Sequence, residues 1–330
     1  MVGTTLNASG IGAVADAFRS ARQITAICHE NPDADTVAGA ISVALMAERL
    51  GKPAEVVSAD GIPPQLAFLP RSDAVRARPS LEPDLAVFCD AATMERVGRI
   101  AKEEAAWLSR ARVLNVDHHV SNTLFGDLNL VDPHASATCE VLAGLADALE
   151  IDPDAELATA LLTGIVRDSH GFSDGSTTGD TLRITARLVD AGAPLAQIHR
   201  SILAELPYAT MALWARMLGT MGRDPSGRVV YALLSQQMLD ETGTEQHDAD
   251  GLAEFLSQVK GADVALLLRE IGPRATRLSV RVTDGVDATR IVAPFGGGGH
   301  ARRAGCTVPA DLSTARDQVL GAVAEVLSAG

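Results

Sequence analysis

This sequence has few aromatic residues, few cysteines and no long apolar run. Aromatic side chains make up 3% of its 330 residues, too few for a long platform on which nucleic-acid bases stack. The longest apolar stretches fall short of the roughly 18 residues that indicate a membrane span, and no signal-peptide pattern is present. The four cysteines, Cys28, Cys89, Cys139 and Cys306, follow no metal-binding spacing. We therefore expect a protein of the reduced cytoplasm without a membrane partner.

Basic charge is also scarce. The chain has 28 Lys and Arg against 42 Asp and Glu, a formal net charge of −14. This balance argues against a protein that coats long duplex nucleic acid, because each neutralised phosphate needs a basic contact. Small anionic substrates remain compatible where metals or local cations receive them. With 47% hydrophobic and 21% charged residues, the composition is that of a globular protein.

Residues 29–35, His-Glu-Asn-Pro-Asp-Ala-Asp, place one imidazole and two carboxylates directly after an apolar run. That run, Ile24 to Cys28, predicts a buried strand, and Thr36 to Leu50 has the length and apolar content of a helix. Ligands collect at such carboxyl ends of parallel strands. Taken alone, the stretch fits a capped, solvated turn about equally well.

The same arrangement recurs along the chain. The predicted strand Leu85 to Cys89 is followed by Asp90, the predicted strand Val113 to Val116 by Asp-His-His, and a predicted helix from Asp154 to Val166 by Asp168. Because acidic or imidazole groups follow successive elements, we expect them to meet. The candidate metal ligands are His29, Asp33, Asp35, Asp90, His118 and Asp168, with Asp117 as a candidate for orienting a ligand.

Four carboxylates and two imidazoles suit two divalent cations such as Mn²⁺, Mg²⁺ or Zn²⁺. Two ions about 3.5–4 Å apart share a donor, and a hydroxide held between them can attack phosphorus at neutral pH. The sequence therefore predicts a two-metal hydrolytic site.

A run of four glycines, 296–299, precedes His300. Glycines let backbone N–H groups approach a phosphate without interference from a Cβ atom. Arg281 and the pair Arg302-Arg303 add positive charge nearby. We expect a substrate-binding segment, with a flexible surface loop as the alternative. The candidate substrate-binding residues are Arg281, Gly296, Gly297, Gly298, Gly299 and His300.

The order of predicted elements indicates an α/β protein with two domains. We expect a metal-binding catalytic domain with a parallel sheet at residues 1–192, a helical linker at 193–224 and a smaller α/β substrate-binding domain at 225–330. The active site is expected in the cleft between the domains, where ligand sites are common.

Together these motifs resemble the DHH/DHHA1 phosphoesterases, a family named for a motif that Asp117, His118 and His119 match here. Residues 29–35 look like its first motif, Asp90 like its second and Asp168 like its fourth. Phe295 to His300, with Ala304-Gly305, looks like the substrate signature of its C-terminal domain. The resemblance implies two Mn²⁺ ions, with Co²⁺ or Mg²⁺ as alternatives. It places His29, Asp33 and Asp90 on one ion, and Asp35, Asp90, His118 and Asp168 on the other. Asp90 would bridge the two ions, His119 would face the scissile phosphate, and Asp90, Asp117, His118 and His119 would form the catalytic group.

Chains of this size in the family resemble bifunctional oligoribonucleases that also act on 3′-phosphoadenosine 5′-phosphate (pAp). The resemblance implies hydrolysis of short single-stranded RNA to mononucleotides and removal of the 3′-phosphate of pAp. The alternatives are a phosphodiesterase for cyclic di-AMP or linear dinucleotides and a catalytically silent nucleotide sensor. A homodimer is left open. The sequence departs from the family pattern at Ala34, Ala40, His170 and Arg303.

Overall fold

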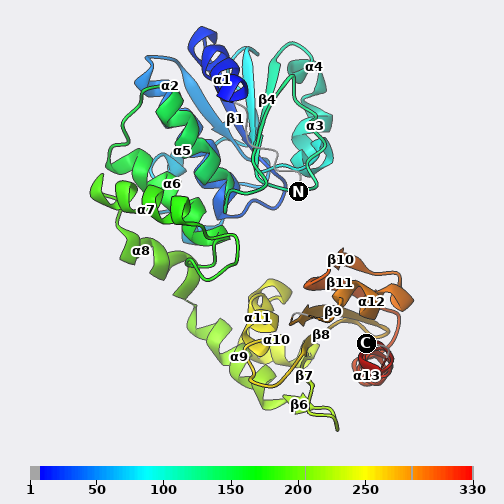
Figure 1. Cartoon of the computed structure of the whole chain (residues 1–330). Helices are drawn as coiled ribbons and strands as arrows, with labels where there is room; N and C mark the ends of the chain where they lie inside the picture. The colour runs from blue at the N-terminus through cyan, green and yellow to red at the C-terminus, as the bar shows by residue number, and fades with distance from the viewer. Residues whose placement is uncertain (1–7, 205, 284, 329–330) are drawn as a thin grey trace. The chain divides into compact units, whose positions relative to one another are not determined.

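The computed structural model describes residues 8–204, 206–283 and 285–328. It divides into two compact units, Met1–Glu205 and Leu206–Gly330. Each unit is an α/β fold with its own sheet (Figure 1), so the predicted fold class is confirmed. The predicted domain limits and the predicted cleft stay predictions. Among the described helices, none has the length and apolar character needed to cross a membrane.

The first unit contains a parallel sheet of five strands in the order β2-β1-β3-β4-β5. Every residue of β1 and β3 is buried, as in parallel sheets covered on both faces. The limits of β1 and β3 agree with those of the two strands predicted there. The strands are β1 (Ile24–Cys28), β2 (Ala54–Val57), β3 (Leu85–Cys89), β4 (Arg112–Asp117) and β5 (Leu128–Val131).

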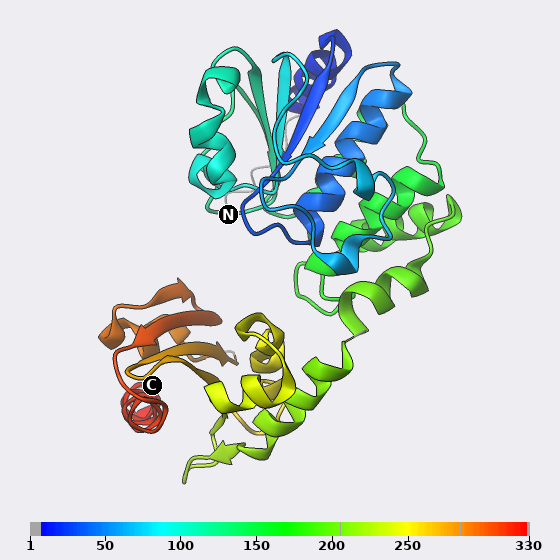
Figure 2. The same cartoon turned by 180° about the vertical axis from the view of Figure 1, so that it is seen from behind.

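Helices cover both faces of this sheet, as Figures 1 and 2 show from opposite sides. One face of the sheet packs on α1, α2 and α5, and α6 packs on α2 and α5 in turn. The other face packs on the short helices α3 and α4. Phe88 of β3 contributes to the second core, whereas its neighbour Val87 contributes to the first. The helices are α1 (Ala8–Ser20), α2 (Ala34–Arg49), α3 (Arg99–Glu103), α4 (Ala105–Leu108), α5 (Thr138–Ala148), α6 (Ala155–Asp168), α7 (Gly179–Asp190) and α8 (Leu195–His199).

The second unit contains a mixed sheet in the order β10-β11-β9-β8-β7-β6, in which only β7 and β8 pair in parallel. One face packs on α12 and α13 and the other on α9, α10 and α11. Its strands are β6 (Gly222–Arg223), β7 (Val229–Leu234), β8 (Val264–Gly272), β9 (Ala275–Val282), β10 (Gly298–His300) and β11 (Arg303–Val308). Its helices are α9 (Tyr208–Gly219), α10 (Gln236–Thr242), α11 (Leu252–Leu256), α12 (Ala288–Val292) and α13 (Leu312–Ser328).

Candidate metal and phosphoester site

The ends of β1 and β3 are tied to the start of α2. The Thr36 hydroxyl accepts a hydrogen bond from the His29 backbone N–H at 3.1 Å and donates one to the Cys89 carbonyl at 2.7 Å. Helix α2 begins at Ala34, two residues earlier than predicted, because Asp33 caps it and accepts from the N–H groups of Asp35 and Thr36. The predicted turn is therefore capped. It also brings Asp33 Oδ1 to 3.7 Å from His29 Nε2.

Asp90 lies at the centre of the cluster. Its backbone adopts φ +63°, a left-handed conformation that is uncommon outside glycine, and its N–H donates to the Val116 carbonyl. One carboxylate oxygen lies 3.4 Å from His29 Nε2, and the other lies 3.6 Å from His118 Nε2. The Thr138 hydroxyl donates to Asp90 Oδ1 at 3.0 Å. Asp90 thus faces His29 with one carboxylate oxygen and His118 with the other, and the second oxygen also lies 3.6 Å from His119 Nδ1.

Asp35 and Asp168 complete the second half of the cluster. Asp35 is fully buried, and its carboxylate accepts from the backbone N–H groups of Thr138 and Cys139 at the start of α5. Asp168 is the last residue of α6, and its Oδ2 lies 3.2 Å from His118 Nε2. Gly164 of α6 lies so close that a Cβ atom there would be 2.2 Å from Asp35 Oδ1.

Two imidazole nitrogens in this cluster are buried without a hydrogen-bond partner, His29 Nε2 and His118 Nε2. In both rings Nδ1 faces a backbone carbonyl, of Glu30 at 2.8 Å and of Ala135 at 3.2 Å. If Nδ1–H donates to these carbonyls, each Nε2 presents a lone pair to the carboxylates. A metal ligand has this arrangement, because the hydrogen bond at one ring nitrogen fixes the tautomer that binds through the other.

Like charges crowd the cluster. Burial raises the pKa of Asp35 well above its usual value, and the nearby Asp168 and Asp90 raise it further. Burial alone would lower the pKa of His29, but Asp33 and Asp90 outweigh it and raise this pKa to about 10. A group of buried carboxylates and imidazoles holds protons unless a cation replaces them.

The donor set therefore fits divalent metal ions. Ligand atoms of His29, Asp33 and Asp90 lie within 4.8 Å of one another, and so do those of Asp35, His118 and Asp168. A third such group joins Asp90 and His118 to His119. The structure thus brings all six predicted ligands together in the first unit, and their assignment to particular ions stays a prediction.

Asp117 and His119 form a second network at the end of β4. Asp117 is fully buried, and its Oδ1 accepts a hydrogen bond from His119 Nδ1 at 2.8 Å. Its Oδ2 accepts one from the Asn122 side-chain amide at 2.6 Å, and Asn122 also donates to Asn115 Oδ1. The hydrogen bond to Asp117 raises the pKa of His119 against the opposing effect of burial. Asp117 is thus placed to orient His119.

Sequence reasoning missed the supporting polar residues Thr138 and Asn122. Thr138 is the first residue of α5 and follows Ala137, which has no side chain that could cap the helix. The sequence around Thr138 therefore does not predict its contact with Asp90. Asn122 follows Asp117 by five residues in a loop, and an Asn in a loop usually indicates only a turn.

The glycine run of the second unit is partly a strand. Gly298 to His300 form β10, which pairs with β11 at the edge of the sheet, and these three residues are exposed. Gly296 ends a 3₁₀ turn with φ +69°, and Gly297 leaves no room for a Cβ atom, which would lie 2.5 Å from Cys306 Cβ. The run is therefore built into the sheet edge, and the alternative of a simple flexible loop does not describe it.

The predicted substrate residue Arg281 has an internal partner. Its guanidinium Nε donates to Glu254 Oε1 at 2.6 Å, and the two residues form a salt bridge. Arg303 stands opposite Arg281 in the β9–β11 register, so Glu254 offsets the repulsion between two like charges.

The remaining departures from the family pattern lie in the first unit. Ala34 opens α2 and is almost fully buried, as is Ala40. His170 follows α6 with φ +49° and is exposed, with Nδ1 3.2 Å from the Asp168 carbonyl oxygen.

Comparison with known proteins gives the same assignment for both units. Residues 23–165 match the family model described as DHH family, N-terminal domain, and residues 226–329 match the DHHA1 domain. A protein of Thermus thermophilus named bifunctional oligoribonuclease and PAP phosphatase NrnA is 34% identical, over 91% of this chain and 89% of that protein. The protein of the same name from Bacillus subtilis is 24% identical, over 78% of this chain and 80% of its own.

The fold has a solved counterpart. The crystal structure of an exopolyphosphatase-related protein from Bacteroides fragilis superposes with a TM-score of 0.88 at 19% identity, covering 98% of both chains. The two domain matches, the extended identity to the Thermus protein and the convergent Asp and His side chains agree: this chain is a phosphoesterase that belongs to the DHH/DHHA1 family.

Proposed function

We propose that this chain hydrolyses short single-stranded oligoribonucleotides to mononucleotides and removes the 3′-phosphate of pAp, with two Mn²⁺ ions as cofactors. The observation that carries the proposal is the pair of unpartnered, buried nitrogens, His29 Nε2 and His118 Nε2, which face opposite oxygens of Asp90. The names of the Thermus and Bacillus relatives support the choice of substrates.

In this proposal, His29, Asp33 and Asp90 hold one ion, and Asp35, Asp90, His118 and Asp168 hold the other. Two bound divalent ions supply positive charge that activates a water molecule and neutralises phosphoryl oxygens. Four ligand carboxylates balance the charge of two such ions, so the loaded site is nearly neutral. The buried contacts of Asp35 and Asp90 with Thr138 and Cys139 fix the ligand positions before substrate binds.

His119 acts on the substrate in this proposal. Its Nδ1–H donates to Asp117, so its other ring nitrogen, Nε2, is the atom free to contact a phosphoryl oxygen. The raised pKa of His119 favours the protonated ring, which donates a hydrogen bond to negative charge that develops there. Its side chain is 43% exposed, so a substrate can reach it.

The test is a comparison of initial rates on a dinucleotide RNA, on pAp and on cyclic di-AMP, each with Mn²⁺, Co²⁺ or Mg²⁺ and after chelation. We expect the dinucleotide and pAp to be hydrolysed faster than cyclic di-AMP, most rapidly with Mn²⁺. A higher kcat/KM for cyclic di-AMP would replace the proposed substrate class, and activity that survives complete removal of metal would reject the mechanism.

A further inference from the structure

A cavity of about 190 Å³ lies directly beside the candidate metal site, within the first unit. Asp33 lines it on the metal side, and Arg167 and Gln65 contribute polar groups. Pro32 and Pro63 are among its apolar walls. Pockets for whole small molecules measure about 300–1,000 Å³, so this one has room for a single group of a larger ligand.

Arg167 is the basic side chain of this cavity. It lies on the last turn of α6, one residue before the candidate ligand Asp168, and it is exposed. Within the described residues its guanidinium has no salt-bridge or hydrogen-bond partner. By contrast, Arg99 on the opposite face of the sheet is paired with Asp60 at 2.6 Å.

Arg167 lies close to the metal site, because it lines the same cavity as the candidate ligand Asp33. Once a divalent cation binds Asp33, that carboxylate no longer offsets the guanidinium. Arg167 then stands beside strong positive charge, an unfavourable place for a cation unless an anion lies next to it.

We propose that Arg167 and the cavity beside Asp33 form a subsite for a second phosphate group of the substrate, adjacent to the scissile one. The inference rests on the proposed function, since it supplies a second contact for the same substrates. A guanidinium binds phosphate through two parallel N–H donors. The enzyme would thereby favour substrates with two phosphates over those with one.

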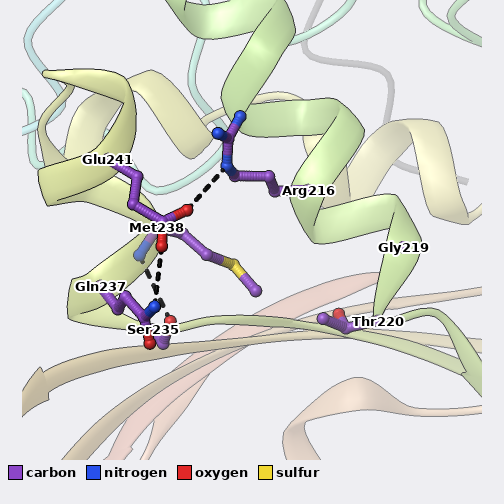
Figure 3. A pocket seen from close by; sticks show the side chains of 7 residues that line it. All are labelled: Arg216, Gly219, Thr220, Ser235, Gln237, Met238 and Glu241. Atoms are coloured by element: carbon purple, nitrogen blue, oxygen red, sulfur yellow. Dashed lines mark hydrogen bonds and ion pairs between the residues drawn. The ribbon is translucent and has the colours of Figure 1, made fainter.

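The second unit offers a matched contrast. A cavity of about 340 Å³ between α9 and α10 also contains an arginine, Arg216, but its Nε donates to Glu241 at 3.1 Å (Figure 3). Its charge is already balanced by Glu241, so Arg216 is not a free cation for an anion. Arg216→Ala is therefore the control for loss of an arginine from a cavity wall.

The experiment compares wild type, Arg167→Ala, Arg167→Lys and Arg216→Ala on two substrates, the dinucleotide ApA and its 5′-phosphorylated form pApA. We expect Arg167→Ala to raise KM for pApA by about 10- to 100-fold, the effect of losing a hydrogen-bonded charge contact, and to change KM for ApA far less. Arg167→Lys should recover part of the loss, because it keeps the charge without the paired donors. Arg216→Ala should match wild type on both.

An equal rise in KM on both substrates, or loss of bound metal in Arg167→Ala, would assign Arg167 to the scissile phosphate or the metal site. No change on either substrate would make it a cation that only stabilises the end of α6. Either result overturns the subsite. If wild type hydrolyses neither substrate, the proposed function fails. Equilibrium binding of pAp and of adenosine 5′-monophosphate then tests the subsite separately. The subsite stands only if Arg167→Ala weakens the binding of pAp more than the binding of adenosine 5′-monophosphate.

Discussion

In the first unit three of the six candidate metal ligands are buried and three are half-buried, and neighbouring groups hold them, whereas in the second unit Gly298 to His300 lie exposed on an edge strand. Asp35 is fixed by two backbone N–H groups and Asp90 by the Thr138 hydroxyl. The glycine run is shaped by the backbone instead, through positive φ at Gly296 and Gly299 and close packing at Gly297. Substitutions should therefore break metal binding and folding in the first region, and substrate affinity in the second.

The largest effect is expected from Asp90→Ala, which removes the one carboxylate among the described residues that faces both His29 and His118. We expect loss of at least one metal ion per chain and a fall in kcat well beyond the about 100-fold typical of a residue that only orients a ligand. Metal analysis and kcat on pAp measure this. Full occupancy by two metal ions in this variant would contradict the proposal that Asp90 binds both ions.

A methyl group at Gly164 should disturb both stability and metal binding. Its carbon would lie 2.2 Å from Asp35 Oδ1 and 2.8 Å from Cys139 Cβ, where α6 packs on α2 and α5. Gly164→Ala should cost about 1–3 kcal/mol of unfolding free energy through overpacking, with weaker metal binding. Gly144→Ala on α5 is the control, since its methyl has no atom nearer than 3.8 Å and should stabilise the helix by about 0.5–1 kcal/mol. Equal stability of the two variants in urea unfolding would contradict the packing argument.

Asp117→Asn tests whether Asp117 orients His119 without binding metal. The buried carboxylate that accepts from His119 and Asn122 is lost, but the six candidate ligands remain. We expect kcat to fall by about 10- to 100-fold with both metal ions retained. Loss of metal in parallel with activity would make Asp117 a ligand.

The metal cluster could be largely predicted from the sequence, because the strand ends and a helix end carry the ligands and parallel strands gather them at one edge. The residues that hold these ligands in place could not be predicted. Thr138 lies 48 residues beyond Asp90, and only the packing of α5 brings the two together. The partner of Arg281 could not be predicted either. The substrate contact of Arg281 stays a prediction, but the sequence gives no sign that its guanidinium pairs with Glu254, 27 residues away.

His300→Ala should have a smaller effect, confined to substrate binding. His300 ends β10, is exposed and lies in a different unit from all six candidate ligands. We expect KM for a dinucleotide and for pAp to rise about tenfold, with both metals bound and much less change for a simple chromogenic phosphodiester. An equal loss on both kinds of substrate would place His300 in the catalytic group.

Gly298→Ala should have the smallest effect, and it separates the two uses of glycine in the run. A Cβ atom at Gly298 meets nothing within 4 Å, and no positive φ requires glycine there, so the fold does not explain this residue. If backbone N–H groups of the run approach the substrate, the added methyl obstructs that approach alone. We expect unchanged stability, within about 0.5 kcal/mol, and a KM for pAp raised roughly threefold to tenfold. Gly321→Ala on α13, which also adds a methyl in open space, should leave KM unchanged. Identical KM values for the two variants would mean that substrate does not contact the run at Gly298, and that His300 binds without it.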